Sequence, residues 1–216
     1  PDDYSHSTFM NTFKRIMRYA LLLITLLLPA FYVAITSFNQ EMIPEKFETS
    51  ISDAREGVPF PSYIEITLMI LAFEVLQEAG LRLPKAIGQT VSIIGTLVVG
   101  QAAVAARIVS APVIIIVAVT GIASFTIPSQ DLSDATKLCK LLLIAFSSII
   151  GLFGIAMGFL LILYHLCTLE SFGVPYLSPF VANEGNDMRD TLFRLPVSWL
   201  KHRPEYLKTK NKRRQE

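Results

Sequence analysis

The chain has 216 residues, 52% of them hydrophobic, and its mean hydropathy of +0.49 is too high for an ordinary soluble domain. Its formal net charge is only +1, and no nucleic-acid-binding motif accompanies the basic C-terminal end, so nucleic acid is not an expected partner. Because several long segments lack charged residues, the sequence predicts an all-α integral membrane protein.

Residues 1–16 form a polar and basic lead-in, and the predicted transmembrane domain covers residues 17–168. Because the chain begins with Pro1 rather than methionine, we expect further sequence ahead of it. The first span is predicted at Arg18–Phe38, where basic residues precede a long apolar run. The acidic loop Asn39–Ser62 should then lie on the outer side of the membrane.

The segment Tyr63–Gly80 has helical periodicity but carries Glu65, Glu74 and Glu78. A charged side chain at the bilayer centre costs roughly 2.5–3.5 kcal/mol even on lenient insertion scales. Counting this segment as a crossing would also place the basic tail outside, against the positive-inside rule. We therefore interpret it as an interfacial or re-entrant amphipathic helix, which leaves about four transmembrane helices.

The other three spans are predicted at Leu81–Arg107, Ile108–Pro128 and Leu141–Leu166. The basic tail, residues 169–216, should be cytoplasmic, as should the N-terminus. Cationic side chains and apolar anchors within Met188–Lys201 predict a contact with anionic lipid.

Small and polar side chains follow one face of the predicted helix Leu81–Arg107. At helical spacing this face carries Gln89, Ser92, Thr96, Gly100 and Ala103, with Val99 at its edge. Such a face favours close helix packing. It also suits a water-filled path if several copies turn it toward a common axis, because four spans of one chain are too few to enclose a channel.

In the channel interpretation, Val99 forms an apolar constriction that gates by dewetting, and the carboxylates of Glu74 and Glu78 attract cations near one mouth. A structural interpretation of the two carboxylates stays open, because Glu78 lies one helical turn from Arg82 and is placed to pair with it.

The last predicted span carries small residues on one face, and the GxxxG spacing of two of them predicts a helix-packing surface. These residues are Ser147, Gly151, Gly154 and Gly158. His165, near the inner end of this span, suits either an interfacial hydrogen bond or a proton site. We find no spacing typical of metal ligands, a nucleophile elbow or a phosphate-binding loop, so no metal, cofactor or catalytic residue is predicted.

Several motifs occur together along the chain. They are Arg55–Pro61 (REGVPFP), Gln77–Pro84 (QEAGLRLP), Ile87–Gln89 (IGQ), Val98–Val104 (VVGQAAV) and Phe172–Pro179 (FGVPYLSP), with RLP at 194–196, Trp199, RP at 203–204 and NKRRQ at 211–215 in the tail. In this combination the chain resembles the A subunit of GerA-type spore germinant receptors, over its membrane part. One departure is that similar proteins often carry an acidic residue and a glycine where this chain has Ala105 and Arg107.

The resemblance implies a complex in the spore inner membrane, in which the A subunit joins a transporter-like B subunit that senses the nutrient and a lipoprotein C subunit. It also implies a soluble region ahead of Pro1, and a ring of A subunits that forms a nutrient-gated ion channel. Two other hypotheses remain open from the residues. One is a non-conducting scaffold that assembles the other subunits, and the other is a membrane enzyme or proton relay using Glu74, Glu78 and His165.

Overall fold

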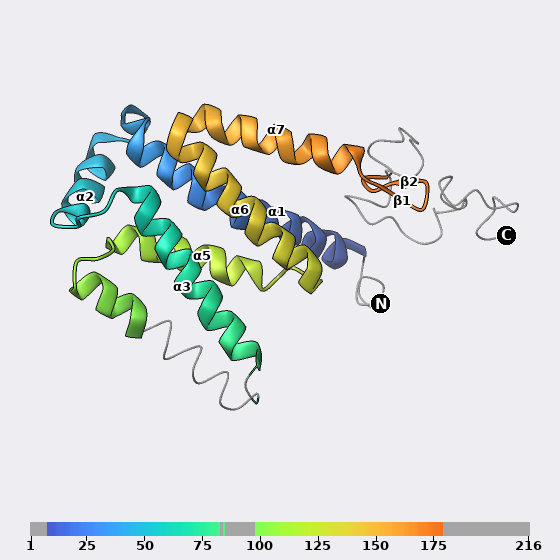
Figure 1. Cartoon of the computed structure of the whole chain (residues 1–216), viewed down its shortest axis with the longest axis horizontal. Coiled ribbons are helices and arrows are strands. Elements are labelled where there is room, and N and C mark those ends of the chain that lie inside the picture. The colour runs from blue at the N-terminus through green and yellow to red at the C-terminus, as the bar shows by residue number, and fades with distance from the viewer. Residues whose placement is uncertain (1–7, 83, 85–97, 179–216) are drawn as a thin grey trace, which may run out of the picture. The chain divides into compact units, whose positions relative to one another are not determined.

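The computed structural model describes residues 8–82, 84 and 98–178, and most of that part of the chain is helical (Figure 1). The helices are α1 (Thr8–Ser37), the short 3-10 helix η2 (Gln40–Met42), α2 (Glu45–Arg55), α3 (Ser62–Arg82), α5 (Ala111–Ser124), α6 (Gln130–Ile150) and α7 (Leu152–Thr168). Residues 98–105 form a further helical segment. The prediction of a predominantly helical protein is confirmed.

The chain divides into two compact units, one formed by Leu22–Phe159 and the other by the residues at its two ends. The core of the Leu22–Phe159 unit consists of apolar side chains from α1, α3, α5 and α6. Its most deeply buried members include Val33, Ala34, Ile66, Ile70, Val113, Leu143 and Ile144.

Local sequence signals explain where the central helices begin. Ser110 precedes α5 with extended backbone angles and Pro112 lies in the first turn, where a missing N–H costs nothing. Pro128 ends the connection that follows α5, and Ser129 then takes the same extended conformation directly before α6. Both helices therefore start after a serine with a proline within two residues of it.

Contacts along the helices define their directions within the Leu22–Phe159 unit. α3 and α5 run parallel, because Glu65 contacts Ser110 at the start of α5 while Phe73, farther along α3, lies against Gly121 near its end. α6 runs parallel to α1, because the Ser147 hydroxyl donates a hydrogen bond to the carbonyl of Ala30 at 2.7 Å, and Gly151 follows beside Phe38 at the end of α1.

The prediction of one continuous span over Leu141–Leu166 is wrong. The backbone turns at Gly151, which has φ +67° and ψ −138°. α7 then packs back on α6, with Gly154 against the carbonyl of Phe146 and Gly158 beside Leu143. A long apolar run conceals this turn because both helices are apolar and only the conformation of one glycine marks the boundary.

The segment Tyr63–Gly80, expected as an interfacial or re-entrant helix, lies within α3, a single helix of 21 residues packed against α5 and α6. At 1.5 Å per residue it is roughly as long as a bilayer core is thick. The cost of burying its carboxylates was one reason not to count this segment as a membrane crossing. Glu65 and Glu74 both have cationic partners from the same chain, which lowers that cost.

The four-span order also disagrees with the contacts. Four crossings would separate residues 107–110 from the loop Asn39–Ser62 by the thickness of the membrane. In the structure, Ser110 hydrogen-bonds Glu65 near the start of α3, and Arg107 lies against Gly57 in the loop itself. By length and apolar composition, α1 alone among the described residues suffices to cross a membrane, and α5 and α7 are shorter apolar helices.

A small antiparallel hairpin follows α7, formed by β1 (Glu170–Ser171) and β2 (Val174–Pro175). Its two central residues, Phe172 and Gly173, have φ +52° and +75°. Positive φ at both positions is typical of the type I′ turn that joins two strands most tightly. The turn leaves the Phe172 ring fully exposed at the tip.

Candidate functional site

A fully buried carboxylate joins three elements of the Leu22–Phe159 unit. Glu65 on α3 has a side-chain exposure of 0%, and its Oε2 accepts hydrogen bonds from the backbone N–H of Ser110 at 2.9 Å and from the Ser110 hydroxyl at 2.8 Å. Its Oε1 lies 3.4 Å from Nε of Arg55, the last residue of α2. We call Arg55, Glu65 and Ser110 the Glu65 cluster.

The environment of Glu65 offsets the cost of burying a charge. The carboxylate sits at the N-terminus of α5, where the helix dipole and unpaired N–H groups favour an anion. Hydrogen bonds to a charged group contribute about 1.5–3 kcal/mol each, and the guanidinium of Arg55 balances the charge. Removing the Arg55 guanidinium therefore leaves the buried carboxylate without a counter-charge, supported only by its hydrogen bonds from Ser110.

Arg107 makes a second contact between the turn after α2 and the corner before α5, and its backbone conformation is unusual. Arg107 ends the helical segment 98–105 with φ +53°, a conformation that glycine adopts far more readily. The N–H of Ile108 donates to the carbonyl of Ala103, and the N–H of Arg107 to that of Val104, both at 2.9 Å. These two bonds form a Schellman motif.

The Arg107 side chain crosses the turn after α2. A Cβ atom added to Gly57 would lie 2.7 Å from a terminal nitrogen of Arg107 and 3.2 Å from its Cδ. Gly57 itself has φ +85°, a backbone conformation that favours glycine, and the Arg107 side chain lies directly against it. The turn after α2 is thus held to the corner before α5 at two places, through Arg55 and through Gly57.

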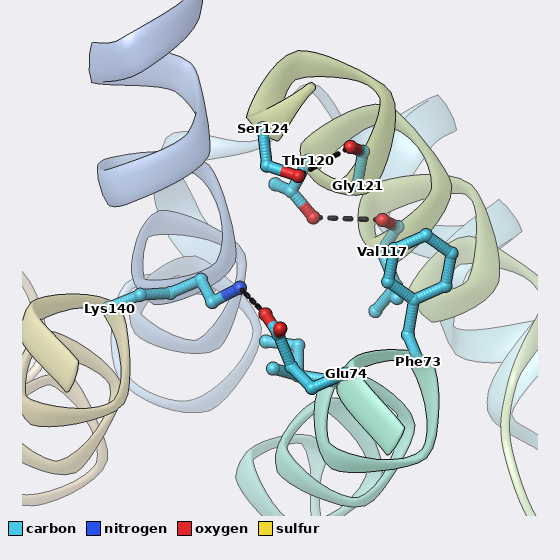
Figure 2. Close-up of a pocket in the computed structure, with 8 residues that line it drawn as sticks. Phe73, Glu74, Val117, Thr120, Gly121, Ser124 and Lys140 are labelled. Carbon is cyan, nitrogen blue, oxygen red and sulfur yellow. Dashed lines mark hydrogen bonds and ion pairs between the residues drawn. The ribbon is translucent and has the colours of Figure 1, made fainter. Parts of the chain in front are cut away.

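A second charged group lies farther along α3, and we call Glu74, Lys137 and Lys140 the Glu74 cluster. The Glu74 carboxylate lies 3.0 Å from Nζ of Lys140 and 3.2 Å from Nζ of Lys137, both on α6. Figure 2 shows Lys140 reaching from α6 toward Glu74. Lys140 is only 5% exposed, so its ammonium depends on this carboxylate for compensation.

A small crevice of about 10 Å³, room for about one water molecule, lies beside the Glu74 cluster. Its lining combines the ion pair with hydroxyl groups and apolar side chains: Ile70, Phe73, Glu74, Val117, Thr120, Gly121, Ser124 and Lys140 (Figure 2). The hydroxyls of Thr120 and Ser124 are already engaged with carbonyls of their own helix. The polar groups of the crevice thus mainly satisfy one another.

The structure describes half of the predicted pore-lining residues. Gln89, Ser92 and Thr96 lie outside the described residues. Val99 is 39% exposed, Ala103 is half-buried, and Gly100 is buried. A Cβ at Gly100 would lie 3.7 Å from the Ile114 side chain of α5, so this side of the segment packs on its own chain. The exposed side carries Val98, Val99, Gln101, Ala102, Ala105 and Ala106.

The other predicted residues fall on different elements. Glu78 is exposed one turn beyond Glu74, and His165 is exposed near the end of α7. Ser147 belongs to α6, Gly151 to the turn, and Gly154 and Gly158 to α7, so they do not share one helix. In the part of the chain that the structure describes, no group of His, Cys, Asp and Glu side chains is placed to hold a metal ion.

Sequence reasoning did not pair Glu65 with Ser110 or Glu74 with Lys140. These partners are 45 and 66 residues apart, so their meeting depends on how the helices pack. One signal was available for the first pair, because a serine followed by Ala-Pro and an apolar run marks a helix start that attracts a carboxylate.

The fold and these ion pairs define a class of protein, a bundle of apolar helices that neutralises its buried charges internally. The family model described as Bacillus/Clostridium GerA spore germination protein matches residues 1–206. The chain therefore belongs to the GerA spore germination protein family, as the sequence motifs predicted. No solved structure matches the chain.

Curated relatives agree with this assignment. The chain is 46% identical to the uncharacterized membrane protein YfkQ of Bacillus subtilis (strain 168), over 94% of this chain and 40% of that protein. It is 42% identical to spore germination protein B1 (94% and 42%) and 44% identical to spore germination protein KA (99% and 39%), both of the same organism. The chain thus spans about two fifths of the length of these relatives.

Proposed function

We propose that this chain is the membrane part of a spore germinant-receptor subunit that assembles into a ring and forms a nutrient-gated cation channel. Membership of the GerA family supports the receptor role. The observation that carries the channel role is the exposed side of residues 98–106, which consists of small side chains, two valines and a glutamine. Several copies of this side meeting at an axis would surround a narrow path with an apolar constriction at Val99.

We further propose that the chain crosses the membrane six times, with both termini in the cytoplasm of the cell or spore. α1, α3, the segment ending at 105, α5, α6 and α7 would be the crossings. Two sets of contacts support this order. The corner at 107–110 contacts Gly57 in the loop after α1 and Glu65 at the start of α3, and the turn at Gly151 contacts the end of α1. The first, third and fifth connections between crossings therefore lie at the same end of the bundle, as six crossings require. An even number of crossings agrees with basic residues at both ends.

The proposed partners are further copies of the chain, a transporter-like B subunit and a lipoprotein C subunit, with anionic lipid at the basic tail. Glu78 is the stronger candidate for attracting cations at one mouth, because it is exposed. Two lysines offset the charge of Glu74. We propose no enzymatic activity, because the curated relatives that carry a functional name are germination proteins.

The runner-up is a scaffold that holds the other subunits and conducts no ions. The close packing of Gly100 on Ile114 favours it, because that side of the segment is filled by the chain itself. In this alternative, the exposed side of residues 98–106 binds a partner helix rather than lining a path.

A pair of matched substitutions separates the two functions. Val99 is 39% exposed and Val119 on α5 is 43% exposed, so Val99→Thr and Val119→Thr make the same chemical change at two exposed valines. In the full-length receptor, the channel predicts that Val99→Thr wets the constriction and raises ion leak without nutrient, with the complex assembled and Val119→Thr unchanged. The scaffold predicts an assembled complex without leak, or loss of the complex.

A further inference from the structure

We propose that Glu65 is a positioning residue that fixes the end of the pore-lining segment to the turn after α2. In this role, the Glu65 cluster transmits movement of the turn after α2, on the outer side of the membrane, to the pore-lining segment. The proposal rests on the proposed channel function and adds a route by which the state of the outer surface controls conduction.

The geometry of the cluster places one side chain at the junction of three elements. The two bonds from Ser110 fix the first residue before α5, only three positions after Arg107, which ends the helical segment. Glu65 itself is held in α3 between the buried residues Ser62 and Ile66. A shift of the carboxylate therefore shifts the corner that links the proposed pore segment to α5.

The cluster reaches the surface through Arg55. Its side chain is 25% exposed, whereas that of Glu65 is 0% exposed. Arg55 ends α2, a helix without any buried residue. α2 therefore lies at the surface of the Leu22–Phe159 unit, and a partner that tilts α2 would pull on the Glu65 carboxylate through Arg55.

Arg107 provides a parallel attachment. Its side chain crosses Gly57, two residues after Arg55, while its backbone closes the Schellman motif at the end of the segment. A displacement of the turn at Gly57 thus reaches the segment through the Arg107 side chain as well as through Ser110. Two attachments only a few residues apart make the turn and the corner move together.

The alternative is that the cluster only stabilises the fold. The two roles differ in what a substitution changes. A stabilising cluster sets how much receptor accumulates, whereas a positioning cluster sets how the accumulated receptor responds to nutrient. The test therefore measures ion release and its dependence on nutrient concentration at equal receptor abundance.

The experiment uses the full-length receptor complex in spores and two variants. Glu65→Gln removes the charge with little change of shape, and Arg55→Gln removes the guanidinium that pairs with it. We expect each assembled variant to release ions severalfold faster without nutrient and to need a different nutrient concentration for half-maximal release. The double variant should resemble either single one, because the two residues act through one contact. Glu45→Gln, an exposed carboxylate at the other end of α2, is the matched control and should behave as wild type.

If Glu65→Gln or Arg55→Gln fails to assemble, Arg55→Lys and Gly57→Ala decide the question, since they perturb the same attachment without removing the buried carboxylate. Wild-type release and nutrient dependence in the assembled variants would overturn the proposal. Failure of all four variants to assemble would assign the cluster to folding and overturn it as well. Val99→Thr is measured in parallel to separate the two proposals. If Val99→Thr alters ion release and the cluster variants do not, the positioning role is refuted and the channel is not. If neither Val99→Thr nor the cluster variants alter ion release, the channel itself is refuted.

Discussion

The Glu74 carboxylate on α3 and the Lys140 ammonium on α6 lie 3.0 Å apart in the interior of the helix bundle. Each would be costly to bury without the other, and the pair lets two helices with charged residues pack among apolar ones. Lys137 lies 3.2 Å from the second carboxylate oxygen and also contacts Asp134 at 3.0 Å, so the pair extends toward the more exposed start of α6.

Loss of the Glu74 carboxylate should destabilise the protein because it strands a nearly buried ammonium. We expect Glu74→Gln to lower the free energy of unfolding by about 2 kcal/mol, below the 3–5 kcal/mol typical of a fully buried pair because Glu74 retains some solvent. Thermal unfolding of the purified protein in detergent measures this. The double variant with Lys140→Met should recover most of the loss, and an equally unstable double variant would contradict the account.

The same substitution tests the proton-relay hypothesis for Glu74, Glu78 and His165. If the Glu74 cluster is structural, Glu74→Gln lowers stability, and the assembled receptor still releases ions on nutrient addition. Abolished release with an intact complex, together with wild-type stability, would instead favour a relay.

Two glycines of α7 should differ in their tolerance of alanine. A Cβ at Gly154 would strike the backbone carbonyl of Phe146, whereas at Gly158 the nearest atom, 2.8 Å away, is the end of the Leu143 side chain. A backbone group cannot move aside as a flexible side chain does, and overpacking typically costs about 1–3 kcal/mol. We expect Gly154→Ala to lower the melting temperature clearly more than Gly158→Ala. Equal effects would show that α7 does not pack on α6 as described.

Arg107 combines an unfavourable backbone conformation with a side chain that contacts the turn. A left-handed conformation costs a residue other than glycine about 1–2 kcal/mol. Arg107→Gly relieves that cost and Arg107→Ala keeps it, while both lose the contact with Gly57. The glycine variant should therefore be more stable than the alanine variant by about 1 kcal/mol in the unfolding assay. A more stable alanine variant would exclude the positive φ at this position.

The order of membrane crossings is open to a labelling experiment. In a background with Cys139 and Cys167 replaced by serine, single cysteines are introduced as Ser52→Cys, Ile108→Cys and Gln130→Cys, all at exposed positions. Six crossings predict that an impermeant maleimide added outside intact cells labels positions 52 and 108 but not 130. Four crossings predict label at 52 and 130 but not at 108.

The sequence predicts the helical class and the family well, because both depend on local pattern: long apolar runs and short motifs. It fails where structure depends on packing. The run from Leu141 to Leu166 gives no sign of a turn, since Gly151 differs from the glycines after it only in its backbone angles. The carboxylates of α3 also argued against it as a membrane crossing, because the charges that neutralise Glu65 and Glu74 come from α2 and α6 and are not visible in the segment itself.

The candidate site shows the same division. Helical spacing places Gly100, Ala103 and Val99 on or near one face. It does not show which of these residues pack against other helices of the same chain and which stay exposed. In the structure Gly100 packs on Ile114 while Val99 stays exposed. The Glu65 cluster escaped prediction because its three residues are drawn from three separate elements.

The most direct test of the channel is chemical modification at Val99. In the cysteine-free background, Val99→Cys and the control Val119→Cys are placed in the full-length receptor, and a small thiol reagent is added before nutrient. We predict that modification at position 99 blocks nutrient-triggered ion release from an intact complex, while modification at position 119 leaves it unchanged. Normal release from receptors fully modified at position 99 would contradict a conducting path along this segment.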